Sequence, residues 1–296
     1  MKKLSRKELR SLINECIIVG GQLHGSNFLG KTRDRNYKPD LEIIRKLMPN
    51  GVEVVYIHDQ VSDYLEGMNS AGIGIVNAAL LVSEDEKAAK VYWGKAKKKG
   101  ASKDGPRMEK ALECDNLRDC IKSLITYEDG IKGHTFVGDG TSIYSIEMTS
   151  KHNPIIKKVN LDDDFTVRTN HGHDHKKAGY TPDGFPEDYI SSKIRQAAAE
   201  DALRSYDDDY EKIMPSIAKQ YFEPNSNYNM LRKVKKKGGM KSSSQVLMNL
   251  KDKEMICYLI PDECNFTGIH DETPEDYTPK INLRMMRYKK WKLMKG

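Results

Sequence analysis

The order of apolar and polar positions along the chain predicts strands more often than helices. Short runs rich in β-branched and aromatic residues recur, and Gly, Asn and Asp separate them. Runs of this kind with turn residues between them are typical of strands joined by hairpins. The expected extended segments are 16–37 and 64–82, each holding two strands and a turn, and 52–57, 134–138, 142–148, 155–159, 165–170, 245–250 and 254–260.

Helical patterns are fewer. Apolar residues recur at helical spacing from Met108 to Ile125, which predicts one helix there. A second helix is expected to begin near Tyr189 and to run to Leu203, because its alanines favour helix strongly. Residues 84–104, rich in Lys, Glu and Ala, are interpreted as a solvated helical surface. The segment 40–48 fits either a helix or a strand.

Strands and helices that occur in separate groups predict an α+β layered domain rather than a parallel doubly wound sheet. At 296 residues the chain is long enough for one large sandwich or two small domains. Charged residues make up 31% of it, and no apolar run approaches the ~20 residues that a membrane-spanning helix needs. The net charge of +6 is a small excess on a densely charged surface, so binding to nucleic acid or to a membrane is not expected.

The cysteines indicate a reducing compartment. The chain has 5 of them, with no Cys-x-x-Cys pair, so we expect free thiols, a cytoplasmic location and no zinc held by cysteine. The basic N-terminal residues do not suggest a secretory signal, because Asn14 and Glu15 interrupt the apolar stretch behind them. The basic tail 284–295 is predicted to form a closing strand or to dock on an acidic partner.

The candidate chemistry lies in the first hairpin. Its first strand begins at Cys16, and its second ends in the charged cluster 31–35. A hairpin would bring the two together, and a nearby cation would then raise the thiolate fraction of Cys16. The alternative reading of these residues alone is a buried structural cysteine.

The chain resembles the cysteine branch of the N-terminal-nucleophile (Ntn) hydrolases, a group that includes bile salt hydrolases, penicillin V acylases, acid-ceramidase-like amidases and the acyl-CoA:6-aminopenicillanic acid acyltransferase type. The resemblance rests on the order and spacing of separate stretches rather than on any one motif. The stretches are Cys16 with its β-branched run, Gly30-Lys-Thr-Arg-Asp-Arg-Asn-Tyr37, Gly67-Met-Asn-Ser-Ala-Gly-Ile-Gly-Ile75, the segment 136–171 and Ser191-Ser-Lys-Ile-Arg195.

This resemblance implies a four-layer αββα sandwich of antiparallel sheets and a cysteine that cleaves linear, non-peptide or small C–N amides, or transfers their acyl group, without a cofactor. In relatives that carry a leader, a cut exposes the α-amine of the nucleophile. Here the leader would be residues 1–15 and the catalytic domain residues 16–296. The freed amine, with a pKa of about 8, would take the thiol proton. Asp34 matches the carboxylate that holds this amine, and the cationic role falls to Lys31 or Arg33.

The same resemblance assigns the remaining site residues. Asn170 matches the asparagine whose side-chain amide donates to the tetrahedral oxyanion. Asn77 is the nearest candidate for a second oxyanion donor, although Ala79 occupies the aligned position. Arg195 fits the Ser-x-x-Arg start of a helix and would organise the site.

Two other function classes remain open. His171, His173 and His175 alternate, and on a strand they would point to one face, as in a metal-dependent hydrolase. The third class is an Ntn-type fold without activity that acts in interactions through its basic segments, because fold does not imply activity.

Overall fold

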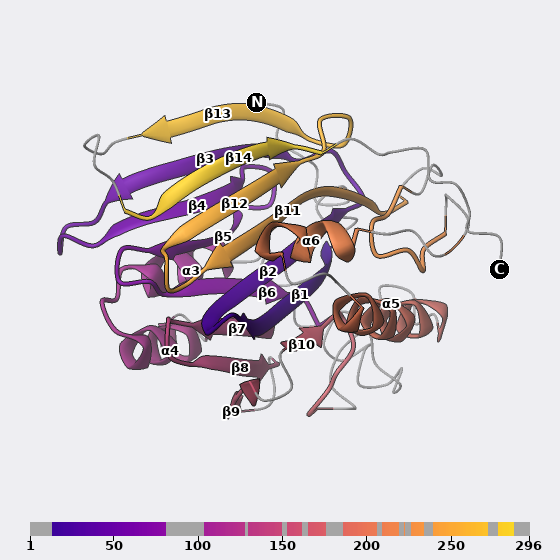
Figure 1. Ribbon diagram of the computed structural model, residues 1–296, viewed down its shortest axis with the longest axis horizontal. Coiled ribbons are helices and arrows are strands. Elements are labelled where there is room, and N and C mark those ends of the chain that lie inside the picture. The colour runs from indigo at the N-terminus through magenta and orange to yellow at the C-terminus, as the bar shows by residue number, and fades with distance from the viewer. Residues whose placement is uncertain are drawn as a thin grey trace, which may run out of the picture.

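Strands that are mostly buried on both faces build two sheets that face each other across one core. The computed structural model describes residues 14–80, 104–127, 130–149, 153–161, 165–175, 186–205, 209–218, 222, 226–233, 239–271 and 278–286. In this part of the chain two helices cover the outer face of each sheet, which gives the four layers seen in Figure 1. The predicted αββα sandwich is therefore confirmed.

The smaller sheet carries the first hairpin. Within the described residues it has six strands in the order β10, β1, β2, β11, β12, β14. Their bounds are Phe165–Arg168, Asn14–Leu23, Ser26–Arg35, Lys241–Asn249, Glu254–Leu259 and Lys280–Met285. Neighbouring strands run antiparallel except β12 and β14, which are parallel.

The larger sheet has eight described strands in the order β13, β3, β4, β5, β6, β7, β8, β9. Their bounds are Asn265–Asp271, Asp40–Leu47, Glu53–Asp59, Tyr64–Asn69, Gly74–Ala78, Gly133–Gly138, Ile143–Met148 and Ile155–Lys158. Strand β13 pairs with β3 in parallel. The sheets are thus antiparallel as expected, except for one parallel pair at an edge of each sheet, β12 with β14 and β13 with β3.

Helices α3 (Asp104–Leu112) and α4 (Leu117–Thr126) pack on the larger sheet. The sequence predicts a single helix over 108–125, but Asn116 ends the pattern because its side chain accepts a hydrogen bond from the backbone N–H of Asp119 and caps α4. Helix α5 (Pro186–Arg204) forms as predicted. With α6 (Ile213–Ser216), which follows the short 3-10 turn η3 (Tyr210–Lys212), α5 packs on the smaller sheet.

Several other expectations can be compared with the structure. The segment 40–48, which fitted either class, is the strand β3. Asn14 and Glu15, assigned to the leader, continue strand β1. The expectations for residues 1–13, for the helical surface up to 103 and for the tail beyond 286 lie outside the described residues. No helix in the described ranges combines the length and the hydrophobicity that crossing a membrane requires.

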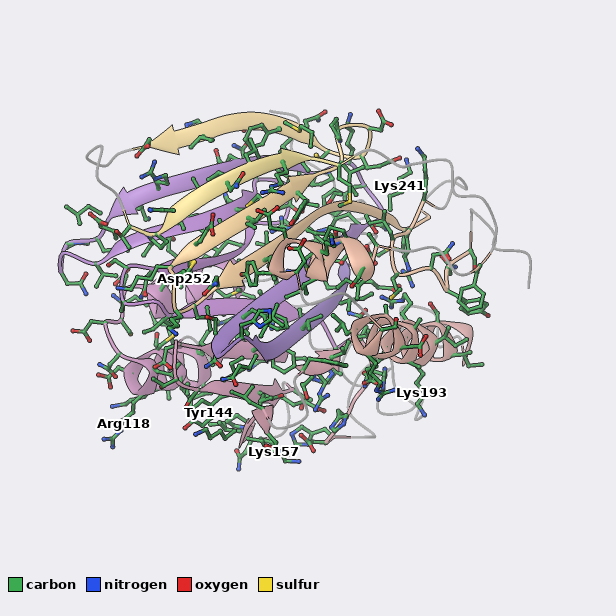
Figure 2. All side chains as sticks on the ribbon, in the orientation of Figure 1. Arg118, Tyr144, Lys157, Lys193, Lys241 and Asp252 are labelled. Atoms are coloured by element: carbon green, nitrogen blue, oxygen red, sulfur yellow. The ribbon has the colours of Figure 1, made fainter. Side chains whose placement is uncertain are left out.

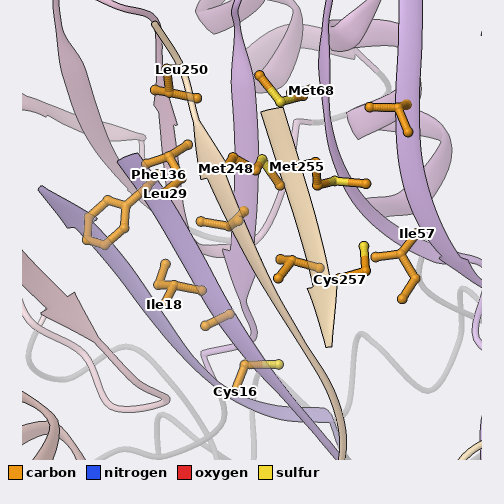
Figure 3. Close-up of a cluster of buried hydrophobic side chains, with 14 of the residues drawn as sticks. Cys16, Ile18, Leu29, Ile57, Met68, Phe136, Met248, Leu250, Met255 and Cys257 are labelled. Atoms are coloured by element: carbon orange, nitrogen blue, oxygen red, sulfur yellow. The ribbon is translucent and has the colours of Figure 1, made fainter. Parts of the chain in front are cut away.

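The core between the sheets is apolar along most of its length and charged at one end. Figure 3 shows Cys16 and Ile18 projecting from β1 into the cluster that also holds Met248 and Met255. Other charged side chains lie at the edge of the molecule, as Lys157 and Lys193 do in Figure 2. The charged end of the core therefore needs its own explanation, and it is where Cys16 lies.

The start of α3 touches the turn before β5 so closely that only glycine fits. A Cβ on Gly105 would overlap the backbone carbonyl of Asp63, which cannot move as a side chain could. We expect Gly105→Ala to lower the free energy of unfolding by about 2 kcal/mol or more, although alanine in a helix is otherwise about 1 kcal/mol better than glycine.

Urea unfolding would measure this change. Gly140→Ala is the matched control, because its Cβ would meet Lys251 at an ordinary 3.6 Å, and we expect a change within about 0.5 kcal/mol. Equal effects of the two variants would contradict the close approach at Gly105.

Candidate functional site

Cys16 lies near the start of β1 and is only 2% exposed. Its backbone N–H donates to Asn170 Oδ1 at 3.1 Å, and Arg35 Nη1 lies 3.7 Å from its sulfur. The nitrogen and the sulfur of one residue therefore have separate partners, one an amide oxygen and the other a cation.

The turn of the first hairpin decides which side chains share a face with this sulfur. His24 and Gly25 both have positive φ, so the turn holds only these two residues, and Cys16 pairs with Arg33. Side chains alternate along a strand, so Lys31, Arg33 and Arg35 point with Cys16 into the core between the sheets. Asp34 pairs with Glu15, and both point to the face that α5 covers.

The core-facing cations pair with two carboxylates of the larger sheet. Lys31 Nζ lies 2.8 Å from Glu66, Arg33 Nη2 lies 2.6 Å from Glu66, and Arg35 Nε lies 3.2 Å from Asp59. We call these five residues the cation cluster. All of them are buried, and three cations face two carboxylates. The cluster therefore has an excess positive charge next to the Cys16 sulfur.

Burial and charge act in opposite directions on the carboxylates of the cation cluster. Burial raises the pKa of Glu66, but the charges of Arg33 and Lys31 outweigh it and hold the pKa below its ordinary value. The pKa of Asp59 is lowered in the same way, against its burial, by Arg35 and Arg33. Burial lowers the pKa of Lys31, and negative charge at Cys16 and Glu66 opposes that shift. Both carboxylates are thus held in their ionised form.

On the other face of β2, Arg195 of α5 and Arg232 of the loop before β11 form what we call the arginine pair. Both donate to Glu15 Oε2, from Arg195 Nη2 at 2.9 Å and from Arg232 Nη1 at 2.6 Å. Against the effect of burial, they lower the pKa of Glu15. Glu15 is therefore a buried carboxylate with two direct cationic partners.

Asp34 lies beside the arginine pair without a direct hydrogen bond to it. Its Oδ2 is 3.8 Å from Arg195 Nη1 and 3.8 Å from Arg232 Nε, and its Oδ1 accepts from Ser242 Oγ at 2.5 Å. Burial dominates here and raises the pKa of Asp34. In the intact chain Asp34 thus lies against the arginine pair, and the partner of the Cys16 nitrogen is Asn170.

Asn170 joins the two faces. Its Oδ1 accepts from the Cys16 N–H and from Arg195 Nη2, at 3.1 Å each, and its Nδ2 donates to the Ala79 carbonyl at 2.7 Å. Because both neighbours of Oδ1 are donors, the orientation of the amide is fixed. The Ser192 hydroxyl of α5 holds the Asn170 backbone N–H at 2.9 Å.

Asn77 is engaged elsewhere in the larger sheet. Its Nδ2 donates to Thr135 Oγ1 at 2.8 Å and to the Lys132 carbonyl at 3.1 Å, and its Oδ1 accepts from the Tyr64 hydroxyl. The geometry of the intact chain therefore does not favour Asn77 as an oxyanion donor.

The three alternating histidines do not face one another. His171 Nδ1 bonds to the Ser192 hydroxyl, while His175 Nε2 bonds to the Asn153 carbonyl. His173 lies with Asp174 and Glu147, the one group within the described residues whose ligand atoms are close enough to share a metal ion. The alternation expected of a strand is lost because this segment is a series of bends.

The structure thus brings together Cys16, Asn170 and Arg195, and it places Arg33 within the cation cluster. The sequence reasoning did not single out Arg35, Glu66, Glu15 or Arg232. Arg35 could have been found, because strand alternation places it on the same face as Cys16. Glu66 and Arg232 come from distant segments, and their contacts depend on how the layers pack.

The cation cluster predicts a large effect of removing one carboxylate. Glu66→Gln leaves three buried cations with one carboxylate, and we expect it to lower the free energy of unfolding by about 3–5 kcal/mol near neutral pH. Since the pKa of Glu66 is lowered from 4.5 in the folded chain, its contribution is complete above that value and is lost as pH falls through the lower folded pKa. The difference between wild type and variant should therefore shrink in acid.

Chemical unfolding at several pH values measures both effects. Asp271→Asn is the control, because it breaks the surface pair between Arg45 and Asp271, in which the Asp271 side chain is 40% exposed. It should lower the free energy of unfolding by less than about 1 kcal/mol. A pH-independent difference for Glu66→Gln would contradict this account.

No protein-family model matches the sequence, and no curated protein matches it at a significant level. Among solved structures, the Caenorhabditis elegans N-acylethanolamine-hydrolyzing acid amidase (NAAA) ortholog is similar with a TM-score of 0.53 and 12% identity, over 79% of this chain and 93% of its own. Penicillin V acylase from Agrobacterium tumefaciens matches over 91% of this chain and 99% of its own, at 11% identity and a TM-score of 0.45. The match to the amidase shows that the chain shares its fold, which agrees with the layered sandwich that the sequence resemblance predicted.

Proposed function

We propose that the protein is a cysteine Ntn hydrolase or acyltransferase that acts on a linear C–N amide of a small molecule. The observation that carries the proposal is the surroundings of Cys16. Its nitrogen is held by Asn170 at 3.1 Å, and its sulfur lies 3.7 Å from a guanidinium in a cluster with excess positive charge. A cysteine that only filled the core would need neither partner.

The proposal includes a cut before Cys16. In the intact chain the Cys16 nitrogen is part of a peptide bond and cannot act as a base. The sulfur would attack the Glu15 carbonyl carbon, the nitrogen would leave with a proton, and water would hydrolyse the resulting thioester. Products are a Glu15 carboxylate and a chain that begins with the free amine of Cys16. Removal of residue 15 would also uncover the buried sulfur.

Hydrolysis of an external amide would follow the same steps. The amine of Cys16 takes the thiol proton, the sulfur attacks the acyl carbon, and the amine returns the proton to the leaving nitrogen. The acyl-cysteine is then released to water or to an acceptor amine. Arg35 lies beside the sulfur, and its Nη2 has no hydrogen-bond partner within the described residues. It could therefore stabilise negative charge that develops there.

The other residues act around this centre. Asn170 would orient the Cys16 nitrogen through Oδ1, and its Nδ2 would donate to the oxyanion once freed from Ala79. Arg195 and Asp34 are positioning residues in this scheme, because Arg195 bonds to Asn170 Oδ1 and Asp34 lies against Arg195. Arg33 would hold Glu66 in the cation cluster.

The cut and the nucleophile can be tested together. We expect mass spectrometry of the purified protein to find a chain that begins at Cys16, and this chain to take up a thiol-directed acylating label at that residue. Cys16→Ala should remain intact and unlabelled at this position, because both steps need the sulfur. Cys257→Ala is the control for labelling, since burial raises the pKa of the Cys257 thiol and should keep it unreactive.

An intact chain that hydrolyses amides at full rate would rule out the amine as the base. Amide hydrolysis that survives Cys16→Ala would rule out the nucleophile. If the chain is neither cut nor able to hydrolyse any amide, the result would favour the third function class, an Ntn-type fold that acts in interactions without catalytic activity.

Asn170 offers a test that separates its two roles. Asn170→Ala loses the acceptor for the Cys16 N–H, so we expect cleavage before Cys16 to be slow. Asn170→Asp keeps that acceptor but has no N–H donor, so cleavage should proceed while kcat for an external amide falls by about 10²–10³. Mass spectrometry follows the first step and steady-state kinetics the second. An aspartate variant as fast as wild type would show that Nδ2 is not an oxyanion donor.

A further inference from the structure

The residue before Cys16 has a side chain that the proposed mechanism leaves unexplained. Glu15 is buried and accepts two charge-assisted hydrogen bonds from the arginine pair, at 2.9 and 2.6 Å. Arg232 also donates to Ser191 Oγ at 2.8 Å, which fixes its guanidinium. A carboxylate is therefore held in a built site directly next to the candidate nucleophile.

The proposed cut makes residue 15 the acyl side of the bond that is broken. In the cut before Cys16, the carbonyl carbon under attack belongs to Glu15, so Glu15 is the acyl part of an internal amide substrate. An external substrate must present its own acyl carbon to the same sulfur. Its acyl chain would then enter the space that Glu15 has left, beyond the new start of β1.

Charge balance says what that space accepts. In the intact chain two buried arginines face two buried carboxylates, Glu15 and Asp34. When Glu15 leaves, Asp34 alone remains opposite the arginine pair. Arg195 Nε and Nη1 already have no hydrogen-bond partner within the described residues. The emptied site would thus hold a buried cation in excess and would favour an anionic group.

We propose that the arginine pair binds the terminal carboxylate of a dicarboxylic acyl group, and that the enzyme prefers glutaryl-type amides. A glutaryl group has the same carbon chain as a glutamate residue from its carbonyl carbon to its side-chain carboxylate. This inference rests on the proposed function. Attack by the Cys16 sulfur forms a glutaryl thioester and releases the amine with its proton, and water then yields glutarate and the free thiol.

The test compares two chromogenic amides on the purified full-length protein in its self-processed form. One is glutaryl p-nitroanilide, and the other is 5-methylhexanoyl p-nitroanilide, in which two methyl groups replace the carboxylate oxygens. We expect kcat/KM for the glutaryl compound to be higher on the order of 10²-fold, because only its carboxylate pairs with the buried arginines.

A variant series locates the preference. Arg232→Met should reduce the ratio of the two kcat/KM values to near unity, and this ratio does not depend on how much of the variant folds. Arg45→Met is the matched control, because Arg45 binds Asp271 at the surface, and it should keep the wild-type ratio.

The outcomes separate this inference from the proposed function. Hydrolysis of both compounds at similar rates, abolished in Cys16→Ala, would leave the function standing and overturn the carboxylate preference. A high ratio that Arg232→Met leaves unchanged would also overturn it, because the carboxylate would then bind elsewhere. Absence of Cys16-dependent hydrolysis of any acyl amide in a wider panel would instead contradict the function itself.

Discussion

Charge pairing on the two faces of β2 is the constraint on which the rest of the site depends. Lys31, Arg33, Asp34 and Arg35 lie within one short stretch of this strand, and all four are completely buried. An unpaired buried ion costs several kcal/mol, so each needs a partner of opposite charge. The partners come from the larger sheet on one face and from α5 and a loop on the other. These charges on the strand are therefore paired only when the larger sheet and the α5 layer have both packed against the smaller sheet.

The two faces place different charges around two consecutive residues, Glu15 and Cys16. The core face surrounds the Cys16 sulfur with the cation cluster, and the outer face holds Glu15 on the arginine pair. Asn170 lies between them because it bonds both to the Cys16 nitrogen and to Arg195. The Asn170 amide therefore connects the charges on the outer face to Cys16.

The sequence allowed the architecture to be predicted better than the site. Runs of β-branched residues with turn residues between them identify the hairpins, and the turn at His24 and Gly25 is enough to derive that Cys16 pairs with Arg33. The same register shows that Asp34 points away from the Cys16 sulfur. The family resemblance assigned Asp34 to the amine of Cys16 and did not use this register. The contacts of Glu66 and Arg232 could not be predicted from the sequence, because they depend on how layers that are distant in sequence pack together. The parallel edge strands were missed for a similar reason, since local pattern does not give strand direction.

Burial poses a problem that the proposed cut before Cys16 would solve. A cysteine that is 2% exposed cannot meet a substrate, yet the paired charges around it are strong only because water is excluded. Removal of the residue before Cys16 would open the site at the arginine pair and leave the core-facing pairs of Lys31, Arg33 and Arg35 closed. Glu15 is suited to that place, since its carboxylate satisfies the arginine pair during folding and its carbonyl is the bond to be broken. On this view the intact chain is an enzyme with an acyl group already bound, and the selectivity of the mature site is set by the residue that it loses.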